Sequence, residues 1–378
     1  MKEGWELLTI KECCDILDSR RKPITKSKRE PGAIPYYGAT GLLDYVKDYI
    51  FDEPLVLLGE DGAKWGAGEC SAYRIEGKSW VNNHAHALRP KRDIVNDYWL
   101  IYFLNYSNLQ SYITGVTVPK LNQEKMCSIT LPAPPLSEQQ RIVDYLDSAF
   151  AKIDAMKANA EKSLNEAKAL FQASLKEMLE PKEGWEEMKF GKICEFVRGP
   201  FGGSLKKECF RDSGYAVYEQ QNAIYNKFTF RYFIDDEKYK SLIRFKVNPG
   251  DLIMSCSGTI GKVAIIPEDC EEGVINQALL KLTPKNKIDA HFLKYLMESN
   301  YFGEIINANI EGVAIKNIAS VAVLKEIILS IPTVSVQQSI VETLDSLKSK
   351  VDRLQANFEK ISQECDALKQ SILRQVFE

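Results

Sequence analysis

The sequence contains a long internal repeat, and this repeat limits the possible folds more than any other feature. Residues 134–180 and 332–378 align without a gap at an offset of 198, with 21 identities in 47 positions. A shorter match opens each half, where Lys-Glu-Gly-Trp-Glu stands at 2–6 and again at 182–186. Because repeated sequences build repeated structures, we expect two related halves, each a globular segment followed by a tail.

Both tails are predicted to be long helices. Prolines at 132, 134 and 135, and at 332, interrupt whatever structure comes before them. Neither tail contains a glycine or proline until Pro181. Ser137 and Ser335, each followed three residues later by glutamine, predict a serine cap at the start of each helix.

The apolar residues of the tails predict that the two helices pair. In the second tail they recur at alternating steps of three and four, which is typical of a coiled-coil seam. The equivalent positions of the first tail are smaller, and small residues facing large ones fill a core without voids. The alternative is that each helix packs only on its own domain. The residues predicted to pair are Leu146, Ala149, Ile153, Met156 and Ala160 in the first tail, and Leu344, Leu347, Val351, Leu354, Phe358 and Ile361 in the second.

The order of the segments along the chain predicts an antiparallel pair. The second globular segment starts at residue 181, directly after the first tail, and leads into the second tail. The second helix therefore begins near the end of the first. A helix of this length spans about 64 Å, so we expect a rod with a globular domain at each end and a pseudo-twofold axis across its middle.

The globular segments are predicted to be α+β domains with short-stranded sheets. Short β-like runs dominate both, followed by one helical stretch and a last strand before the proline break. Asn83-His84 and Asn276-Gln277 are predicted to stand opposite each other in the two segments. We therefore divide the chain into globular segments 1–133 and 181–331 and helical segments 134–180 and 332–378.

Composition excludes several classes of protein. With 45% hydrophobic and 27% charged residues, the chain is expected to fold around well-formed cores. No apolar run approaches the roughly 20 residues of a membrane span, and no signal peptide is visible, so a cytoplasmic location is expected. The nine cysteines include no pair with C-x-x-C spacing, which argues against a disulfide framework or zinc cluster. We expect no metal site.

Charge is balanced overall but clustered locally. Residues 1–133 contain 17 basic and 17 acidic residues, and residues 181–331 contain 20 of each. One early loop in each segment is basic, and aromatic and amide residues follow it. Cations hold phosphate oxygens, whereas Arg, Asn and Gln contact base edges, so these loops predict DNA binding. The predicted DNA-binding residues are Arg20, Arg21, Lys22, Lys26, Lys28, Arg29, Tyr36, Tyr37, Gly38, Lys64, Trp65, Asn83, His84, Lys120, Arg198, Ser204, Lys206, Lys207, Gln220, Gln221, Asn222, Ser257, Thr259, Lys262, Asn276 and Gln277.

Motifs for catalysis are mostly missing from the sequence. There is no G-x-x-x-x-G-K-[ST] loop, and SGTIGK at 257–262 lacks its spacing. There is no G-x-S-x-G elbow. Glu60 and Asp61 near Lys64 loosely resemble a nuclease cluster, but the second segment has no carboxylates at the matching place. If the two segments are equivalent, these carboxylates do not form a shared active site.

These features together resemble the specificity subunits of type I restriction–modification systems. The resemblance rests on the duplicated Gly-Trp-Glu openings, on GEDGAKWG and GDLIMSCSGTIGK, and above all on LPAPPLSEQQRIVDYLD echoed by IPTVSVQQSIVETLD. GVTVPKLN at 115–122 also fits this family, whereas GVAIKNIA in the second half lacks the proline. The resemblance covers the whole chain.

The resemblance implies a recognition subunit without catalytic residues. Each globular segment would read one half of a split, asymmetric DNA sequence, and the helices would be conserved spacers. Two modification subunits that use S-adenosylmethionine, and two restriction subunits that use ATP and Mg, would be its partners. Three alternatives stay open: a specificity subunit of a type IIB-like system, a coiled-coil adaptor that does not bind DNA, and a nuclease using Glu60 and Asp61.

Overall fold

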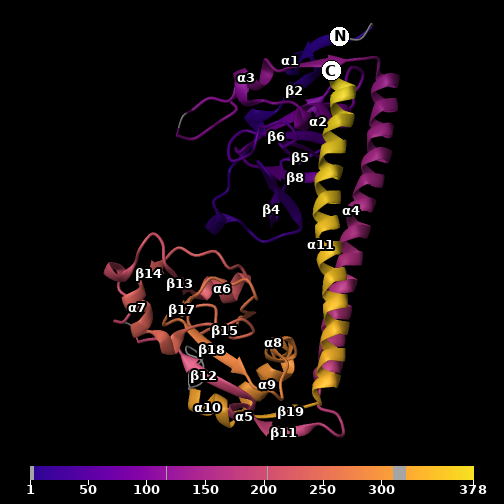
Figure 1. Cartoon of the computed structure of the whole chain (residues 1–378). Helices are drawn as coiled ribbons and strands as arrows, with labels where there is room; N and C mark the ends of the chain where they lie inside the picture. Colours follow the sequence, from indigo (N-terminus) through magenta and orange to yellow (C-terminus); the bar gives the residue numbers. More distant parts are fainter. Residues whose placement is uncertain (1–3, 116, 202, 310–320) are drawn as a thin grey trace. The chain divides into compact units, whose positions relative to one another are not determined.

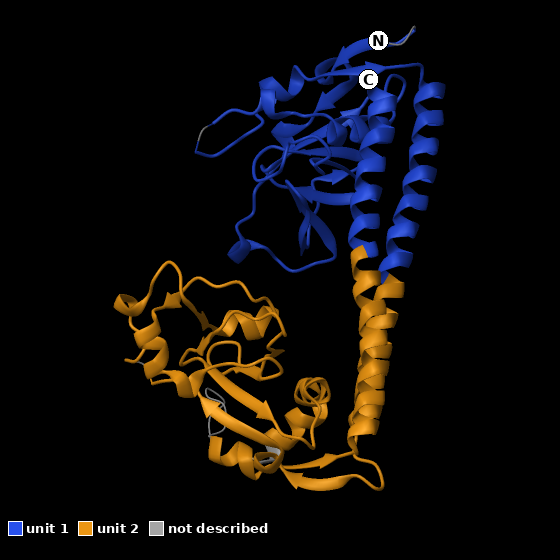
Figure 2. Ribbon diagram, in the orientation of Figure 1, with its two compact units in different colours: residues 1–161, 357–378 blue, residues 162–356 orange. Residues whose placement is uncertain are grey.

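The computed structural model describes residues 4–115, 117–201, 203–309 and 321–378 (Figure 1). The chain forms two compact units, residues 1–161 with 357–378 and residues 162–356 (Figure 2). Both long helices, α4 (Leu136–Leu179) and α11 (Val334–Phe377), contribute to both units and have 44 residues each. We call the globular part before α4 domain 1 and the part between α4 and α11 domain 2.

The described residues of domain 1 form two four-stranded sheets and one two-stranded sheet. The first sheet is antiparallel, in the order β2 (Cys14–Ile16), β9 (Ala85–Pro90), β6 (Leu55–Gly59) and β7 (Ala72–Ile75). The second has the order β4 (Gly41–Val46), β3 (Ile34–Gly38), β8 (Lys78–Val81) and β5 (Phe51–Asp52). The third pairs β1 (Glu6–Thr9) with β10 (Thr130–Ala133). The helices are α1 (Ile10–Cys13), α2 (Asp97–Tyr106) and α3 (Gln123–Cys127).

Domain 2 repeats this plan in the part of the chain that the structure describes. Its first sheet has the order β12 (Cys194–Arg198), β18 (Leu279–Pro284), β15 (Leu252–Ser255) and β16 (Val263–Ile265). A second has the order β14 (Phe233–Ile234), β13 (Tyr215–Tyr218) and β17 (Gly273–Ile275), and β11 (Glu186–Lys189) pairs with β19 (Ile328–Ile331). The helices are α5 (Phe190–Ile193), α6 (Gln220–Tyr225), α7 (Asp236–Ser241), α8 (Ala290–Glu298), α9 (Asn300–Asn309) and α10 (Val321–Glu326). The α+β prediction is confirmed for both domains.

Matching backbone hydrogen bonds show which residues of the two domains are equivalent. Glu60 N donates to His84 O at 2.8 Å, and Cys256 N donates to Ala278 O at 2.8 Å. The side-chain oxygen of Asn82 accepts from the backbone N–H of His84, and that of Asn276 accepts from that of Ala278. Asn82 therefore corresponds to Asn276. The prediction that Asn83-His84 stands opposite Asn276-Gln277 is wrong by one residue, because the conserved asparagine is the first residue of the turn.

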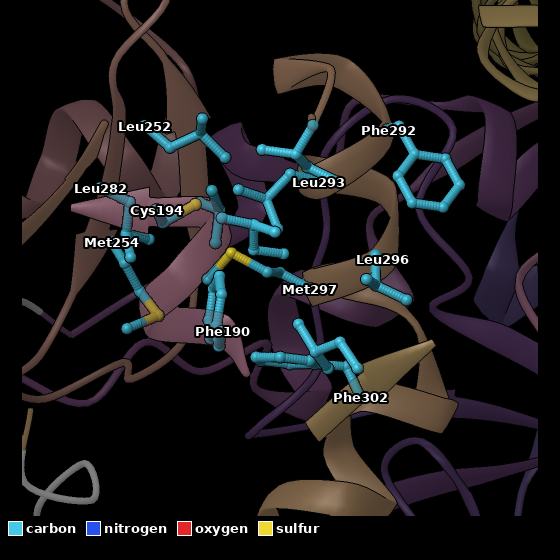
Figure 3. Close-up of a cluster of buried hydrophobic side chains, with 14 of the residues drawn as sticks. Phe190, Cys194, Leu252, Met254, Leu282, Phe292, Leu293, Leu296, Met297 and Phe302 are labelled. Atoms are coloured by element: carbon cyan, nitrogen blue, oxygen red, sulfur yellow. The ribbon is translucent and has the colours of Figure 1, made fainter. Parts of the chain in front are cut away.

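Apolar side chains of α8 cover the first sheet of domain 2 (Figure 3). The helix begins after Asp289, whose side chain accepts from the backbone N–H groups of His291 and Phe292. Phe292, Leu293 and Leu296 are completely buried in the same hydrophobic cluster as Leu252 and Leu282 of this sheet.

The long helices complete both cores at their ends. The start of α4 and the end of α11 lie in the core of domain 1, whereas the start of α11 and the end of α4 lie in that of domain 2. The contributing buried residues are Ile142, Val143, Leu146, Leu373 and Val376 in domain 1, and Leu175, Leu179 and Leu344 in domain 2. Each helix thus packs on its own domain and also on the other one.

One glutamine fixes the start of each long helix to its domain. Gln139 is fully buried; its amide nitrogen donates to the carbonyls of Ile94 and Pro134, and its oxygen accepts from the N–H of Asn96. Gln337, its repeat partner, makes the same three bonds in domain 2. The repeated Gln-Gln motif is therefore a joint between helix and domain.

The serine caps predicted from the sequence are wrong. The carbonyls of Pro135 and Thr333 accept from the N–H groups of Gln139 and Gln337, so each helix begins directly after that residue. Ser137 consequently lies inside the first turn, as does its repeat partner.

The two long helices pair in antiparallel directions. Lys369 Nζ lies 2.6 Å from Asp154 Oδ1, and Lys168 Nζ lies 2.8 Å from Gln355 Oε1. Moving toward the C-terminus of α4, from Asp154 to Lys168, the contacted residue of α11 moves toward the N-terminus, from Lys369 to Gln355. Ile153 O also accepts a long contact from the Cys365 thiol at 3.7 Å. The predicted antiparallel pairing is confirmed.

The seam of α4 differs from the predicted one. Met156 is 59% exposed and does not pair, whereas Leu164, which was not among the predicted pairing residues, is only 3% exposed. Because the large side chain of Leu164 is buried, the first helix is not built only of small residues where it packs. Leu146 and Leu344 are buried in the domain cores, and the remaining predicted pairing residues, Ala149, Ile153, Ala160, Leu347, Val351, Leu354, Phe358 and Ile361, are buried or half-buried.

This seam makes a testable contrast between two neighbouring residues. We expect Ile153→Ala to lower the free energy of unfolding by about 2–4 kcal/mol, because it leaves a cavity between the helices. Met156→Ala should change it by less than about 0.5 kcal/mol, because that side chain is exposed. Thermal unfolding of both variants measures the difference, and equal losses would contradict the assigned seam.

Candidate nucleic-acid interface

The basic loop of domain 1 comprises residues 20–29, and its arginines bind their own domain. Arg20 pairs with Glu53 at 3.1 Å, and Arg29 pairs with Asp44 at 3.0 Å. Arg21 is largely buried in a network of ion pairs. Arg20, Arg21 and Arg29 therefore have a structural role in their own domain, and their predicted roles in DNA binding stay predictions.

The lysines of the same loop remain available. Lys22, Lys26 and Lys28 are exposed, and none has an ion-pair partner among the residues that the structure describes. Lys26 and Lys28 lie on a single turn of 3-10 helix. These three cations are therefore suited to hold phosphate oxygens.

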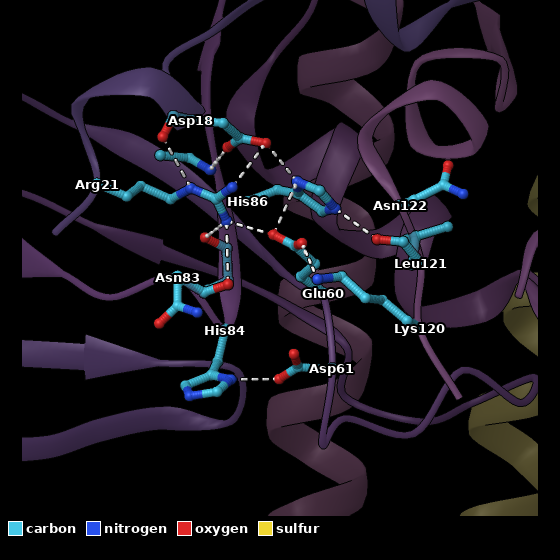
Figure 4. A network of polar contacts seen from close by, with 12 residues as sticks. Asp18, Arg21, Glu60, Asp61, Asn83, His84, His86, Lys120, Leu121 and Asn122 are labelled. Carbon is cyan, nitrogen blue, oxygen red and sulfur yellow. Dashed lines mark hydrogen bonds and ion pairs between the residues drawn. The ribbon is translucent and has the colours of Figure 1, made fainter. Parts of the chain in front are cut away.

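A buried polar network lies behind the loop (Figure 4). Arg21 contacts Glu60 at 2.5 Å and Asp18 at 3.2 Å, and Lys120 Nζ lies 2.8 Å from the second oxygen of Glu60. His86 Nδ1 lies 2.5 Å from Asp18. Burial alone would raise the pKa of Glu60, but hydrogen bonds from Lys120 and Arg21 outweigh it and hold the pKa below its ordinary value.

The same network bears on the metal and nuclease hypotheses. Asp18, Glu60 and His86 offer ligand atoms within 4.8 Å of one another. However, the Arg21 guanidinium binds both carboxylates, so a protein cation already takes the place that a metal ion would occupy. Glu60 is therefore explained as an ion-pair partner rather than a metal ligand.

The network anchors the loop that carries the GVTVPKLN motif. Leu121 N donates to Glu60 O at 2.8 Å, and Leu121 O bonds to His86 Nε2 at 2.7 Å. Thr114 and Lys120 exchange two backbone hydrogen bonds that close the loop. Lys120 thus holds the loop base, and Val118 beyond it is 66% exposed. The corresponding motif of domain 2, at 312–319, lies outside the described residues.

Several other predicted contact residues are structural. Tyr36 and Trp65 are buried; the Tyr36 hydroxyl accepts from Ile24 N, and Trp65 Nε1 donates to Gly59 O. Asn222 is fully buried and caps its own helix. Gly38 is buried and Tyr37 half-buried. The structure thus gives Tyr36, Gly38, Trp65 and Asn222 a role in the packing of their own domains, and their predicted DNA contacts stay predictions.

Exposed polar residues in domain 1 lie on the turns next to the basic loop. Asn83 and His84 follow β8, and Lys64 follows β6. Arg21 donates to the carbonyl of Asn83 at 3.5 Å and ties loop and turn together. His84 Nδ1 is hydrogen-bonded to Asp61.

Domain 2 presents comparable polar residues on its turns, but it has Ser257 in place of the carboxylate of Asp61. Its basic loop lies against the asparagine turn, since a Cβ built on Gly199 would meet Asn276 O at 1.8 Å. Gln220 Oε1 is buried without a hydrogen-bond partner in the described residues. The other predicted residues of this domain are exposed or half-buried: Arg198, Ser204, Lys206, Lys207, Gln221, Ser257, Thr259, Lys262, Asn276 and Gln277.

Two exposed aromatic residues were missed by the sequence reasoning. Phe201 is 90% exposed and Tyr225 is 75% exposed. Such side chains can stack on bases or wedge between them. The glycine-rich surroundings of Phe201, which leave it little to pack against, were a usable signal.

A duplicated α+β domain with lysine-bearing loops beside amide-bearing turns, linked by paired helices, defines a tandem DNA-recognition protein. The family model described as the type I restriction modification DNA specificity domain matches residues 2–166 and again residues 182–363. The chain therefore belongs to the family of type I restriction–modification DNA specificity subunits.

Individual relatives agree with this assignment. The chain is 29% identical to a putative type I restriction enzyme specificity subunit of Haemophilus influenzae, over 90% of this chain and 86% of that protein. It is 25% identical to a type I restriction enzyme specificity subunit of Methanocaldococcus jannaschii, over 93% and 87% of the two chains.

Solved structures share the fold. The HsdS subunit from Thermoanaerobacter tengcongensis matches with a TM-score of 0.60 at 16% identity, over 100% of this chain and 97% of that one. A chain from a structure of the type I R-M system matches with a TM-score of 0.73 at 15% identity, over 100% and 98%. Among the described residues, no helix is long and apolar enough to cross a membrane.

Proposed function

We propose that this DNA specificity subunit reads a bipartite, asymmetric double-stranded DNA site, with one half-site for each domain. One observation carries the proposal: equivalent turns on the same backbone scaffold bear different side chains. Domain 1 has Asn83 and His84 where domain 2 has Gln277 and Ala278. Two readers with different chemistry are suited to two different half-sites.

The paired helices are proposed to set the gap between the half-sites and to dock the partner subunits. The long helices carry exposed apolar and aromatic side chains. Tyr145 and Met156 of α4 are more than half exposed, and Leu368 of α11 is 48% exposed. Exposed apolar groups at intervals along a helix fit a partner helix. We infer two modification and two restriction subunits as partners.

The chemistry is proposed to reside in the partners. S-adenosylmethionine, ATP and Mg would bind there, and the carboxylate best placed for catalysis on this chain, Glu60, is neutralised by Arg21 and Lys120. A non-catalytic role in a cytoplasmic complex is consistent with these features. A type IIB-like assembly would differ in its partner subunits.

The test is co-expression of this chain with its modification subunit, followed by mapping of methylated adenines. We expect one split motif with a fixed gap. Methylation without a two-part motif, or negligible DNA binding of the complex at low salt, would contradict the proposal; the second result would favour the adaptor.

The three free lysines provide a second prediction. Changing Lys22, Lys26 and Lys28 together to alanine should weaken DNA binding by the complex and make the slope of log affinity against log salt shallower by about 3. Changing the exposed Lys152, Lys162 and Lys176 of α4 is the matched control. Binding measured across a salt series checks this, and an unchanged slope would remove the loop from the interface.

A further inference from the structure

His84 is an exposed side chain held in a fixed orientation. Its side chain is 52% exposed, and Nδ1 is hydrogen-bonded to Asp61, whose side chain is 21% exposed (Figure 4). Its backbone is fixed as well: the N–H donates to the Asn82 side chain at 2.8 Å, and the carbonyl accepts from Glu60 N at 2.8 Å. Such support on both sides is typical of a preorganised contact rather than of a mobile surface residue.

The partner of Nδ1 determines what the other ring nitrogen can do. An ionised carboxylate only accepts hydrogen bonds, so the ring hydrogen of the neutral imidazole lies on Nδ1. Nε2 then carries a lone pair as an acceptor, and it has no hydrogen-bond partner among the residues that the structure describes. The exposed lysines of domain 1, such as Lys64 and Lys22, by contrast offer only donors.

An acceptor on this surface has few possible targets on DNA. Phosphates and most base edges present acceptors themselves, and within the major groove only adenine N6 and cytosine N4 carry amino donors. We propose that His84 Nε2 reads one such exocyclic amino group in the first half-site and that Asp61 positions the ring. This inference rests on the proposed function and adds the residue pair and the base chemistry.

Domain 2 lacks the pair. Ala278 occupies the position of His84. The residue after Cys256, which corresponds to Glu60, is Ser257 in place of Asp61. The contact therefore belongs to the first half-site alone and contributes to the asymmetry of the whole site.

The experiment uses the complex with its modification subunit and duplexes in which each base pair of the wild-type motif is replaced in turn. His84→Ala should lower discrimination at one position of the first half-site about tenfold and leave the second half-site unchanged. His84→Lys, which presents only donors, should shift the preference at that position from adenine to guanine or from cytosine to thymine.

Asp61→Ala tests the positioning role. Discrimination should fall at the same position, and the nitrogen NMR signals of His84 should change from one tautomer to a mixture. The chain contains only three histidines, so the His84 signals can be assigned by comparison with His84→Ala. An unchanged tautomer would overturn the role of Asp61.

Two results would overturn the inference while leaving the proposed function intact. One is full discrimination by His84→Ala at every position of the first half-site. The other is an equal loss of methylation rate on all duplexes, which would indicate a backbone contact. A wild-type complex that marks no two-part motif would overturn the proposed function itself and this inference with it.

Discussion

Gln337→Leu should lower the free energy of unfolding of domain 2 by about 3 kcal/mol, because three buried backbone groups lose their partner. The side chain is fully buried and bonds to Asp289 N at 2.7 Å, Lys287 O at 3.0 Å and Pro332 O at 2.8 Å. Leucine has a similar volume but no hydrogen-bonding group. Chemical denaturation followed by domain-resolved hydrogen exchange measures the loss.

The next residue provides the control. Gln338 is exposed, so Gln338→Leu should change stability by less than about 0.5 kcal/mol. Gln139→Leu should reproduce the effect in domain 1, because that side chain makes the same three bonds. Similar stability of Gln337→Leu and Gln338→Leu would show that the joint is not a major source of stability.

Removal of residues 369–378 should unfold domain 1 and spare domain 2. The segment contains Leu373 and Val376, which are buried in the core of domain 1, and Phe377, whose ring lies 4.8 Å from that of Trp99. With half-buried Ile372, their apolar burial stabilises the domain by about 6 kcal/mol. This is comparable to the whole stability of an ordinary domain, about 5–15 kcal/mol.

Hydrogen exchange resolved by peptide distinguishes the domains in that variant. Peptides of β6 and β9 should lose protection, whereas those of β15 and β18 should keep it. A point-mutation pair refines the test: Leu373→Ala should destabilise domain 1, and Leu368→Ala, at a 48% exposed position, should not. Equal protection of both domains after truncation would contradict the role of the helix end.

The architecture could be predicted because the repeat carries it. Twenty-one identities at one offset, proline breaks and an apolar spacing of three and four predict two domains and two paired helices from local information alone. The predicted seam holds at Ile153 and Ala160 but fails at Met156, and it omits Leu164 and Phe171, which are packed. Two adjacent faces of a helix are related by a shift of one residue in the sequence. Only the tertiary packing determines which of these faces contacts the partner helix.

The candidate site could be predicted only in part, for a different reason. A run of six cations looks uniform in sequence, but Arg20, Arg21 and Arg29 each meet a carboxylate from a distant strand or turn. Those partners are set by sheet pairing, which no local pattern reveals. In the same way, Tyr36 and Trp65 have polar atoms that suit DNA, yet these atoms bond to backbone groups inside the domain.

The placement of the α11 end has a consequence for how the protein is made. Domain 1 is synthesised before domain 2, but two residues of its core, Leu373 and Val376, follow domain 2 along the chain. A chain that is still growing on the ribosome therefore holds a first domain with an open apolar cavity. The core of domain 1 can therefore be completed only after domain 2 and both long helices have been synthesised. A fragment without α11 would lack these core residues, so its first domain should be less stable than in the full chain.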